Sequence, residues 1–504
     1  MESSRLAAIQ SNRGAGTGTA EPTEKGSLEA YLSRCREYIK KSAEVYRNLA
    51  GDAKKQKLTE LISKFVLANQ NYMIDGYMSE SNKLETTKVI DKLVSEIIDY
   101  SILTVAMEDP DVFEIRANGK EIKVEKHGRV VDLTDAQGNI VSFESVEQQE
   151  IIMRKLLGDT RLTPKNALVN ARTIEGFRIA AVHSSAMSPD PQDPTAPLYN
   201  SFVLRKFKKS KMGLPEIVKY KTLSDNMARL LSLLPKGGLT WFTVGPTASG
   251  KTTTNNAILQ EVPATTRTVL VQNPSEIDLR FKDAKGRVYN DVLHLEGRDI
   301  ENPEPTDPTM QNIMTHVLRL SPTFVCFGEL RTNMEFKLGL QIMQAGHPVN
   351  STFHAETSDG AIRRFLTAYL AESGNEPSDL ALMTLTSLVR IIVVQKILRD
   401  GTRKIIQISE VVGVDPDNPN KAAINDLYKF VITHTEYDEQ GMVKSINGYH
   451  KRVGKLSEGI IDKLKLEGCN ESQYDFIVKD PDPEEVEEYT GLNINSYGMK
   501  VGAA

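Results

Sequence analysis

The sequence has few cysteines, few aromatic residues and no long hydrophobic run. Its 504 residues include three cysteines, one tryptophan and 6% aromatic residues in total. Cys35, Cys326 and Cys469 lie far apart and share no zinc-type spacing with the eight histidines, which argues against disulfides and a structural zinc site. No window approaches ~18 consecutive apolar residues, and the N-terminal segment lacks the apolar core of a secretory signal. We therefore expect a cytoplasmic protein without a membrane-spanning helix.

The charge of the chain is nearly balanced. It has 62 Lys and Arg against 67 Asp and Glu, which gives a net charge of −5, and 40% of its residues are hydrophobic. These are the proportions of an ordinary globular protein, and at ~150 residues per domain the length predicts two or three domains. A net acidic chain also argues against nucleic acid as a specific partner.

The composition and the periodicity of the sequence change several times along the chain. Residues 223–430 alternate strand-like and helical runs, which is typical of an α/β domain with a largely parallel sheet. The stretch around residue 207 is rich in lysine, and the residues beyond Lys479 are acidic and predicted to be flexible. The predicted parts are a disordered leader (1–26), a helical extension (27–85), an α+β domain (86–206), a linker (207–222), the α/β domain (223–466) and an acidic tail (467–504).

A phosphate-binding loop is the strongest motif. The segment GPTASGKT matches G-x-x-x-x-G-K-[ST] between an apolar run and a helical stretch. Backbone N–H groups of such a loop surround a phosphate, the lysine reaches the β- and γ-phosphates, and the last hydroxyl holds Mg²⁺. The predicted nucleotide-binding residues are Gly245, Pro246, Thr247, Ala248, Ser249, Gly250, Lys251, Thr252 and Thr253.

Hydrolysis also needs a carboxylate near the γ-phosphate. Glu329 follows the apolar run Phe324–Phe327, so it is predicted at the carboxyl end of a buried strand, where ligands gather in open α/β sheets. Glu276 is a second candidate, with a role near a helix N-terminus as the structural alternative. His347 and His354 could face one cleft, with His354 near the γ-phosphate, although a lone histidine is more often a packing residue.

Four motifs in a fixed order extend this interpretation. They are GPTASGKTTT (245–254), VQNPSEI (271–277), FVCFGELR (324–331) and AGHPVNSTFHAETSDGAIRRF (345–365). With these motifs the sequence resembles the secretion ATPases of type II, type IV and type IV-pilus systems, and within them the branch of conjugation and Tad-pilus ATPases. In that family the four segments correspond to Walker A, the Asp box, Walker B and the His box. The resemblance covers residues 86–466.

The resemblance implies a RecA-like P-loop ATPase domain preceded by an α+β N-terminal domain and a helical N-terminal extension. It also implies a hexameric ring that binds ATP and Mg²⁺ between the two domains and couples hydrolysis to transport or pilus assembly. The expected partners are platform proteins at the cytoplasmic face of the inner membrane. The family would therefore place this chain at that membrane as a peripheral protein.

The resemblance assigns roles to individual residues. Lys251 and Thr252 correspond to the phosphate and Mg²⁺ residues, and Glu329 corresponds to the Walker B glutamate near the metal. Further correspondences are Glu276 as the catalytic glutamate of the Asp box, His354 as the His-box histidine, Arg178 and Arg205 as N-terminal-domain arginines that reach the phosphates, and, more weakly, Arg298 and Arg331.

The chain departs from the family pattern at three positions, where neutral residues stand in place of acidic ones. Gln272 and Asn273 stand where relatives carry acidic residues, and Thr323 replaces an aspartate that often begins the Walker B strand. If the two amides matter chemically, hydrolysis would be slow or would depend on a partner. Two alternatives therefore stay open, which are a nucleotide-binding scaffold ring without hydrolysis and a nucleic-acid translocase.

Overall fold

The structure is a computed structural model of the chain. It describes residues 24–491, except for 43–44, 46–48, 50, 75, 80–83, 99, 127–128, 136, 159, 174–175, 207–211, 274, 299, 301–302 and 375. Most of the predicted leader, the first part of the predicted linker and the last part of the predicted tail lie outside these residues. The chain divides into two compact units, Met1–Phe207 and Lys208–Ala504, which we call unit 1 and unit 2.

Unit 1 begins with a small helical core. Its elements are β1 (Glu24–Gly26), α2 (Leu28–Lys41), α4 (Gly51–Ala68), β2 (Tyr72–Ile74) and α5 (Thr86–Ile98). Apolar residues at helical spacing, among them Tyr31, Ile62 and Leu93, are buried together, and β1 pairs with β2 in parallel. The sequence analysis placed α5 at the start of the α+β domain, whereas α5 packs with α2 and α4 because its apolar face completes their core.

The rest of unit 1 is a six-stranded antiparallel sheet. The strands are β3 (Val112–Asn118), β4 (Glu121–Lys126), β5 (Arg129–Asp132), β6 (Leu168–Arg172), β7 (Arg178–Val182) and β8 (Ser201–Arg205), in the order β5-β4-β3-β8-β7-β6. Buried side chains such as Ile115, Ile179 and Leu204 alternate with exposed ones. The buried face packs against α6 (Thr104–Glu108) and α7 (Val146–Leu157), so this part has the predicted α+β composition.

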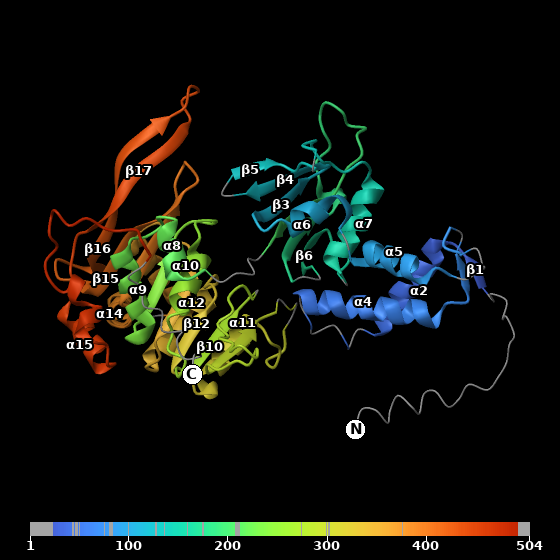
Figure 1. Ribbon diagram of the computed structural model, residues 1–504. Coiled ribbons are helices and arrows are strands. Elements are labelled where there is room, and N and C mark those ends of the chain that lie inside the picture. Colours follow the sequence, from blue (N-terminus) through green and yellow to red (C-terminus); the bar gives the residue numbers. More distant parts are fainter. Residues whose placement is uncertain are drawn as a thin grey trace. The chain divides into compact units, whose positions relative to one another are not determined.

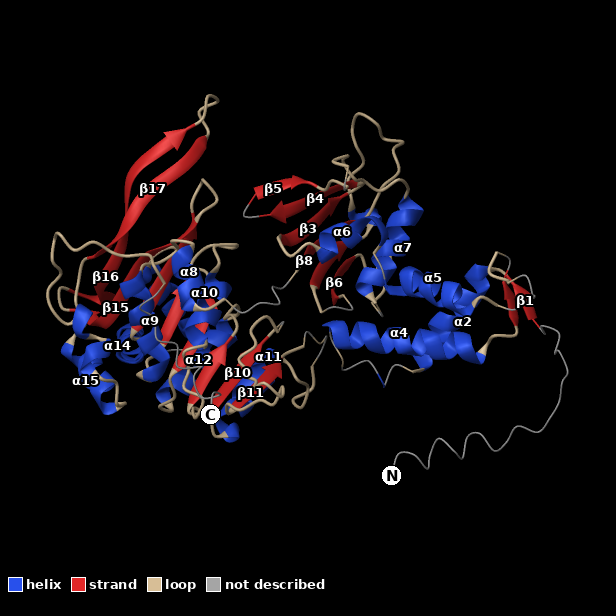
Figure 2. Cartoon of the chain, in the orientation of Figure 1, coloured by secondary structure: helices blue, strands red, loops and turns tan. Residues whose placement is uncertain are grey.

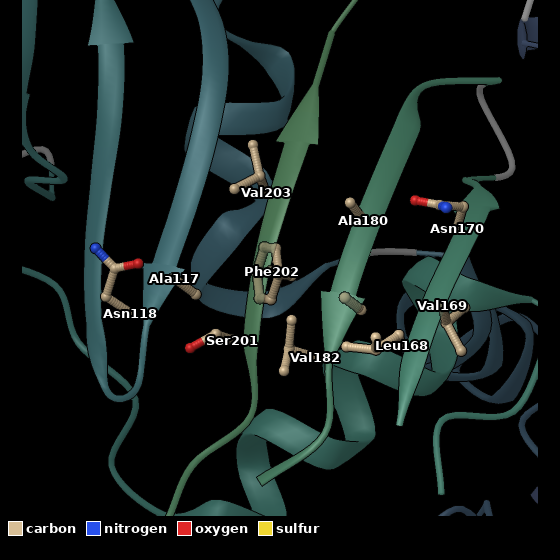
Figure 3. Close-up of a pocket in the computed structure, with 11 residues that line it drawn as sticks. Ala117, Asn118, Leu168, Val169, Asn170, Ala180, Val182, Ser201, Phe202 and Val203 are labelled. Carbon is tan, nitrogen blue, oxygen red and sulfur yellow. The ribbon is translucent and has the colours of Figure 1, made fainter. Parts of the chain in front are cut away.

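The other face of this sheet carries a shallow hollow of about 290 Å³. Figure 3 shows its lining side chains on neighbouring strands, with Ala180 and Val203 in the middle and Leu168 at one side. The lining consists of small or apolar side chains together with Asn118, Asn170 and Ser201, and it contains no charged group. This hollow therefore does not have the chemistry of a phosphate site.

Unit 2 is built on a nine-stranded sheet (Figure 1). The strands are β9 (Trp241–Val244), β10 (Thr268–Gln272), β11 (Val292–Glu296), β12 (Phe324–Phe327), β13 (Val349–Phe353), β14 (Ile391–Ile397), β15 (Arg403–Asp415), β16 (Asn418–Tyr437) and β17 (Val443–Arg452). In the order β11-β10-β12-β13-β9-β14-β15-β16-β17, the first six are parallel and the last three antiparallel. The carboxyl ends of β9, β10, β12 and β13 therefore meet at one edge.

Helices cover both faces of this sheet (Figure 2), which confirms the predicted α/β class. One face holds α8 (Leu214–Lys219), α9 (Asp225–Lys236), α10 (Lys251–Leu259) and α15 (Glu458–Leu466); the other holds α11 (Met310–His316), α12 (Asn333–Gln344), α13 (Ser358–Ser373) and α14 (Ser378–Leu388). Successive strand residues enter opposite cores, as Trp241 and Phe242 do. Strands buried on both faces read as continuous apolar runs, which is why the sequence revealed them.

Parts of the predicted linker and of the predicted flexible tail are packed against the rest of unit 2. In the predicted linker, Leu214, Ile217 and Val218 of α8 are buried in the first core of unit 2. In the predicted flexible tail, Glu485 forms an ion pair of 2.7 Å with Arg452 of β17, and Glu487 accepts a hydrogen bond of 2.5 Å from the Ser224 hydroxyl. Residues 479–491, which we call the C-terminal strap, are thus fixed by an ion pair and a hydrogen bond that acidic composition alone does not reveal.

All three cysteines are free thiols, in line with the absence of disulfide spacing. Within the part of the chain that the structure describes, no helix is both long enough and apolar enough to cross a membrane.

Candidate nucleotide-binding site

The phosphate loop lies between β9 and α10 and has an unusual backbone. Gly245 and Gly250 have φ values of 155° and 91°, and Ala248 has a φ of 62°. A Cβ atom on Gly245 would stand 2.0 Å from the carbonyl oxygen of Gln395, so this position requires glycine. The loop ends at the N-terminus of α10, where backbone N–H groups and the helix dipole favour an anion.

Polar side chains hold the loop from inside. The Lys251 ammonium and the Ser249 hydroxyl donate to the carbonyl of Pro246 at 2.8 and 2.9 Å. Lys251 is buried, and Thr252 is half-buried next to it at the start of α10. The lysine and the hydroxyl thus lie next to each other at the N-terminus of α10, where the phosphate loop ends.

Glu329 and His354 come together at the edge of the sheet. Glu329 follows β12, and His354 follows the neighbouring strand β13. The imidazole Nε2 lies 3.4 Å from a Glu329 carboxylate oxygen, and Nδ1 lies 3.2 Å from the carbonyl of Gly245. Because a carbonyl only accepts, Nδ1 carries a proton in this contact, and His354 joins the phosphate loop to the carboxylate.

Arg331 also belongs to this group. Its Nε donates to Glu329 at 2.7 Å, so the carboxylate has a cationic neighbour as well as the imidazole. The turn itself is fixed by β13, since Thr352 donates its hydroxyl to the Gly328 carbonyl and accepts the Leu330 N–H, both at 2.9 Å. Glu329 is therefore presented by a rigid turn.

Glu276 follows β10, which is the strand next to β12. Its side chain is half-buried, and its backbone N–H donates to the side chain of Gln272 at 3.0 Å. The structure thus places both candidate glutamates after adjacent parallel strands. Asn273 lies between Gln272 and this segment and is also half-buried.

His347 does not share the site with His354. The two residues flank β13, so they lie at opposite ends of the strand, and the idea that they face one cleft is wrong. A strand of five residues separates its ends by about 15 Å, a distance that the spacing of seven residues in the sequence conceals. Arg298 is exposed after β11.

The candidate arginines Arg178 and Arg205 lie in unit 1, whereas the residues described above lie in unit 2. They are direct cross-strand neighbours on β7 and β8. Arg205 pairs with the buried Glu114 at 3.2 Å, and Arg116 pairs with the same carboxylate at 2.5 Å. Arg205 therefore has a structural partner in addition to any role toward phosphate.

Two groups near the site were missed by the sequence analysis. Arg403 on β15 donates from Nε to the carbonyl of Ala248 in the phosphate loop at 3.0 Å. Behind the loop, the amides of Asn255 on α10 and Asn350 on β13 hydrogen-bond to each other at 2.8 and 2.9 Å, and both are completely buried. Neither has a spacing signal, since the contacts cross 155 and 95 residues of chain.

The oxygen groups available to a metal here are few. Among the described residues, no group of three or more His, Cys, Asp or Glu side chains could hold a metal ion. Mg²⁺ at phosphate sites usually takes one or two protein oxygens and completes its shell with phosphate and water. The Thr252 hydroxyl and the Glu329 carboxylate, next to a glycine-shaped anion cradle, suit that kind of site.

Comparison with known proteins finds one family whose model matches most of the chain. The profile of the family described as "Type II/IV secretion system protein" matches residues 91–453, which is well over half of the chain. The chain belongs to this family. The match spans both units and includes the phosphate loop, Glu276, Glu329 and His354, so it confirms the resemblance stated from the motifs.

Individual relatives match shorter parts of the chain. The chain is 30% identical over 229 residues to the uncharacterized protein MJ0900 of Methanocaldococcus jannaschii, covering 45% of this chain and 38% of that protein. It is 34% identical over 154 residues to the type II secretion system ATPase E of Vibrio cholerae, covering 30% and 26%. The chain thus matches well under half the length of each of these two relatives.

A solved structure is also similar. The X-ray structure of the Legionella pneumophila ATPase DotB matches 63% of this chain and 83% of its own, with 19% identity and a TM-score of 0.45.

Proposed function

We propose that this member of the type II/IV secretion family is an ATP-hydrolysing motor. The observation that carries the proposal is the contact of His354 with both Gly245 of the phosphate loop and Glu329. This contact links the group that binds phosphate to the group that polarises or orients water. A structural glycine turn would not need either connection.

In this proposal, different residues of unit 2 have separate roles in ATP binding and hydrolysis. Backbone N–H groups of the loop and the Lys251 ammonium bind the phosphates and neutralise their charge. Thr252 and Glu329 would hold Mg²⁺, which lowers the charge of the triphosphate when it is bound. Glu276 or Glu329 orients the attacking water and accepts its proton, and His354 senses the γ-phosphate position through its two contacts.

Unit 1 supplies arginines in this proposal. Arg178 and Arg205 reach the phosphates when the two units close on the nucleotide, and closure is the step that delivers mechanical work. We propose a homohexamer acting with platform proteins at the inner face of the membrane, in secretion, conjugation or pilus assembly. The family membership and the matched span across both units support this proposal.

A non-hydrolysing scaffold ring is the alternative that the neutral Gln272 and Asn273 suggest. Steady-state phosphate release from the purified chain with Mg-ATP separates the two, with Lys251→Ala as the control. We expect release that rises faster than linearly with protein concentration and disappears in the variant. Nucleotide binding without release at any concentration would refute hydrolysis and support the scaffold.

Stimulation by single-stranded DNA that weakens steeply with salt would instead support a nucleic-acid translocase. We expect no such stimulation, because the chain is net acidic.

A further inference from the structure

The side chain of Gln272 makes an unusually complete set of hydrogen bonds. It is the last residue of β10 and is 1% exposed. Nε2 donates to the Ser275 hydroxyl and to the carbonyl of Ile277, both at 2.8 Å. Oε1 accepts the N–H groups of Glu276 and Ile277 at 3.0 and 2.9 Å. A primary amide has two donors and two acceptor sites, so all four are used.

All four partners belong to one short segment. Residues 275–277 include Glu276, and the amide of Gln272 hydrogen-bonds to all three of them. Buried amide hydrogen bonds fix geometry strongly, because any that are left unmade cannot be replaced by water. The backbone of Glu276 is therefore held by a side chain from the end of the sheet.

Gln272 also contacts the segment that carries the other candidate carboxylate. A Cβ atom on Gly328 would stand 2.8 Å from the Cβ of Gln272, so the two residues are packed directly together. The Gly328 N–H donates to the carbonyl of Val271 at 2.9 Å. Since Glu329 follows Gly328, Gln272 lies between the two glutamate-bearing segments.

We infer that Gln272 is a positioning residue that holds Glu276 in register with Glu329, and that this position requires an uncharged amide. This inference rests on the proposed ATPase function. It differs from the view that Gln272 stands in place of a metal-shell carboxylate, because all four hydrogen bonds of the amide are made to residues 275–277. A carboxylate here could accept the two N–H groups but could not donate to the carbonyl of Ile277.

The test compares Gln272→Glu and Gln272→Met, which keep the length of the side chain, with Gln341→Glu as a control. Gln341 is exposed on α12 of the same unit, so its variant reports any general effect of the added charge. The measurements are kcat and KM for phosphate release, ADP affinity, and hydrogen exchange of the amides of Glu276 and Ile277. All are made on the full chain.

We expect both Gln272 variants to lower kcat by at least about tenfold, with KM and ADP affinity within about twofold of wild type. In Gln272→Met, exchange of the two amides should accelerate by at least about tenfold, because their acceptor is lost. In Gln272→Glu, exchange of the two amides should change less, because the carboxylate still accepts both N–H groups. For Gln272→Glu, the ratio of variant to wild-type turnover should rise as the pH falls, because a protonated carboxyl regains one donor. The control should show none of these changes.

Three outcomes would overturn the inference. They are wild-type exchange at both amides in Gln272→Met, equal losses in kcat and nucleotide affinity, or faster turnover in Gln272→Glu, which would favour a metal-shell role. If the wild-type chain binds nucleotide but releases no phosphate, the proposed hydrolysis fails, and hydrogen exchange still decides the positioning role.

A milder variant covers the case in which the Gln272 variants do not fold. Ser275→Ala removes one acceptor of the amide at a half-exposed position. We expect a twofold to fivefold acceleration of exchange at Ile277, roughly in proportion to one bond lost. Unchanged exchange in this variant would count against the role of Gln272.

Discussion

Glu329 is the residue on which most contacts of the site converge. Its carboxylate meets the Arg331 guanidinium on one side and the His354 imidazole on the other, and it is about one-quarter exposed. These two contacts hold the carboxylate in one orientation. We propose that the negative charge of Glu329, rather than its shape, is what the site requires.

Glu329→Gln keeps the shape and removes the charge. We expect ATP affinity within about threefold of wild type and a kcat that falls at least about 100-fold, as for loss of a general base or metal-shell carboxylate. Nucleotide titration and phosphate release measure the two quantities. Glu439→Gln, an exposed position in the turn between β16 and β17, serves as the matched control. Normal turnover in Glu329→Gln would remove this residue from the mechanism.

Gly245 shows how strictly a single position is constrained. A methyl group there would meet a backbone carbonyl at 2.0 Å, and backbone cannot move away as a flexible side chain can. We expect Gly245→Ala to destabilise the chain by about 1–3 kcal/mol and to weaken ATP binding at least tenfold. Thermal unfolding and nucleotide titration test this.

Gly286→Ala is the matched control for this substitution. Gly286 also has a positive φ, of 79°, but a Cβ atom there would have nothing within 4 Å. Its variant should show backbone strain of about 1 kcal/mol with unchanged ATP affinity. Equal affinity losses in the two variants would mean that the contact with Gln395 is unimportant.

At the scale of elements, the C-terminal strap is the least expected part of unit 2. It returns to the N-terminus of α9, where Asp225 accepts the N–H groups of Thr490 and Gly491 at 3.0 and 2.8 Å. On its way it covers His450, whose Nδ1 lies 3.0 Å from the Tyr489 hydroxyl. Buried titratable groups make the strap sensitive to pH.

Burial lowers the pKa of His450 to about 4. The unfolded chain binds a proton near pH 6.5 and the folded chain does not, so stability falls as the pH drops from about 6.5 to 4, by up to about 3 kcal/mol. Urea unfolding of the full chain across this window should show the loss. His450→Gln should flatten the curve, and an unchanged slope would show that another group controls it.

Burial has the opposite consequence for Glu487, whose pKa it raises. Because the pKa of Glu487 is higher in the folded chain, its contribution to the free energy of unfolding is fully present below the unfolded pKa near 4.5. This contribution is lost as the pH rises through the pKa of the folded chain. Glu487→Gln should therefore raise the melting temperature at pH 8 and leave it unchanged or lower at pH 4. A lower melting temperature at pH 8 would show that the charge of Glu487 is stabilising.

The sequence predicted the elements that carry strong local signals. The phosphate loop and the strand before Glu329 follow from glycine spacing and apolar runs. The strap escaped prediction because its acidic residues bind partners that are distant in the sequence, such as Ser224, which lies 263 residues from Glu487. The roles of Gln272 and Arg403 also depend on contacts that composition does not encode.

At the scale of the whole molecule, the proposed mechanism depends on unit 1 acting on a nucleotide bound in unit 2. Arg178 lies on β7 beside Arg205, which is held by Glu114. We expect Arg178→Ala to lower kcat at least about tenfold and to change ATP affinity by less than threefold, because the contact forms on closure. Phosphate release and nucleotide titration measure both. Equal losses would mean that Arg178 binds only the ground state.

The position of β9 in the sheet has a consequence for how the chain is made. Its two neighbours, β13 and β14, lie roughly 110 and 150 residues later in the sequence. At 5–20 residues per second, a ribosome needs roughly 8–30 s to deliver both after β9 has been synthesised. During that interval both edges of β9 are unpaired, and the segment relies on delayed partners or a chaperone to avoid wrong pairing. Nucleotide can therefore assist folding only late in synthesis.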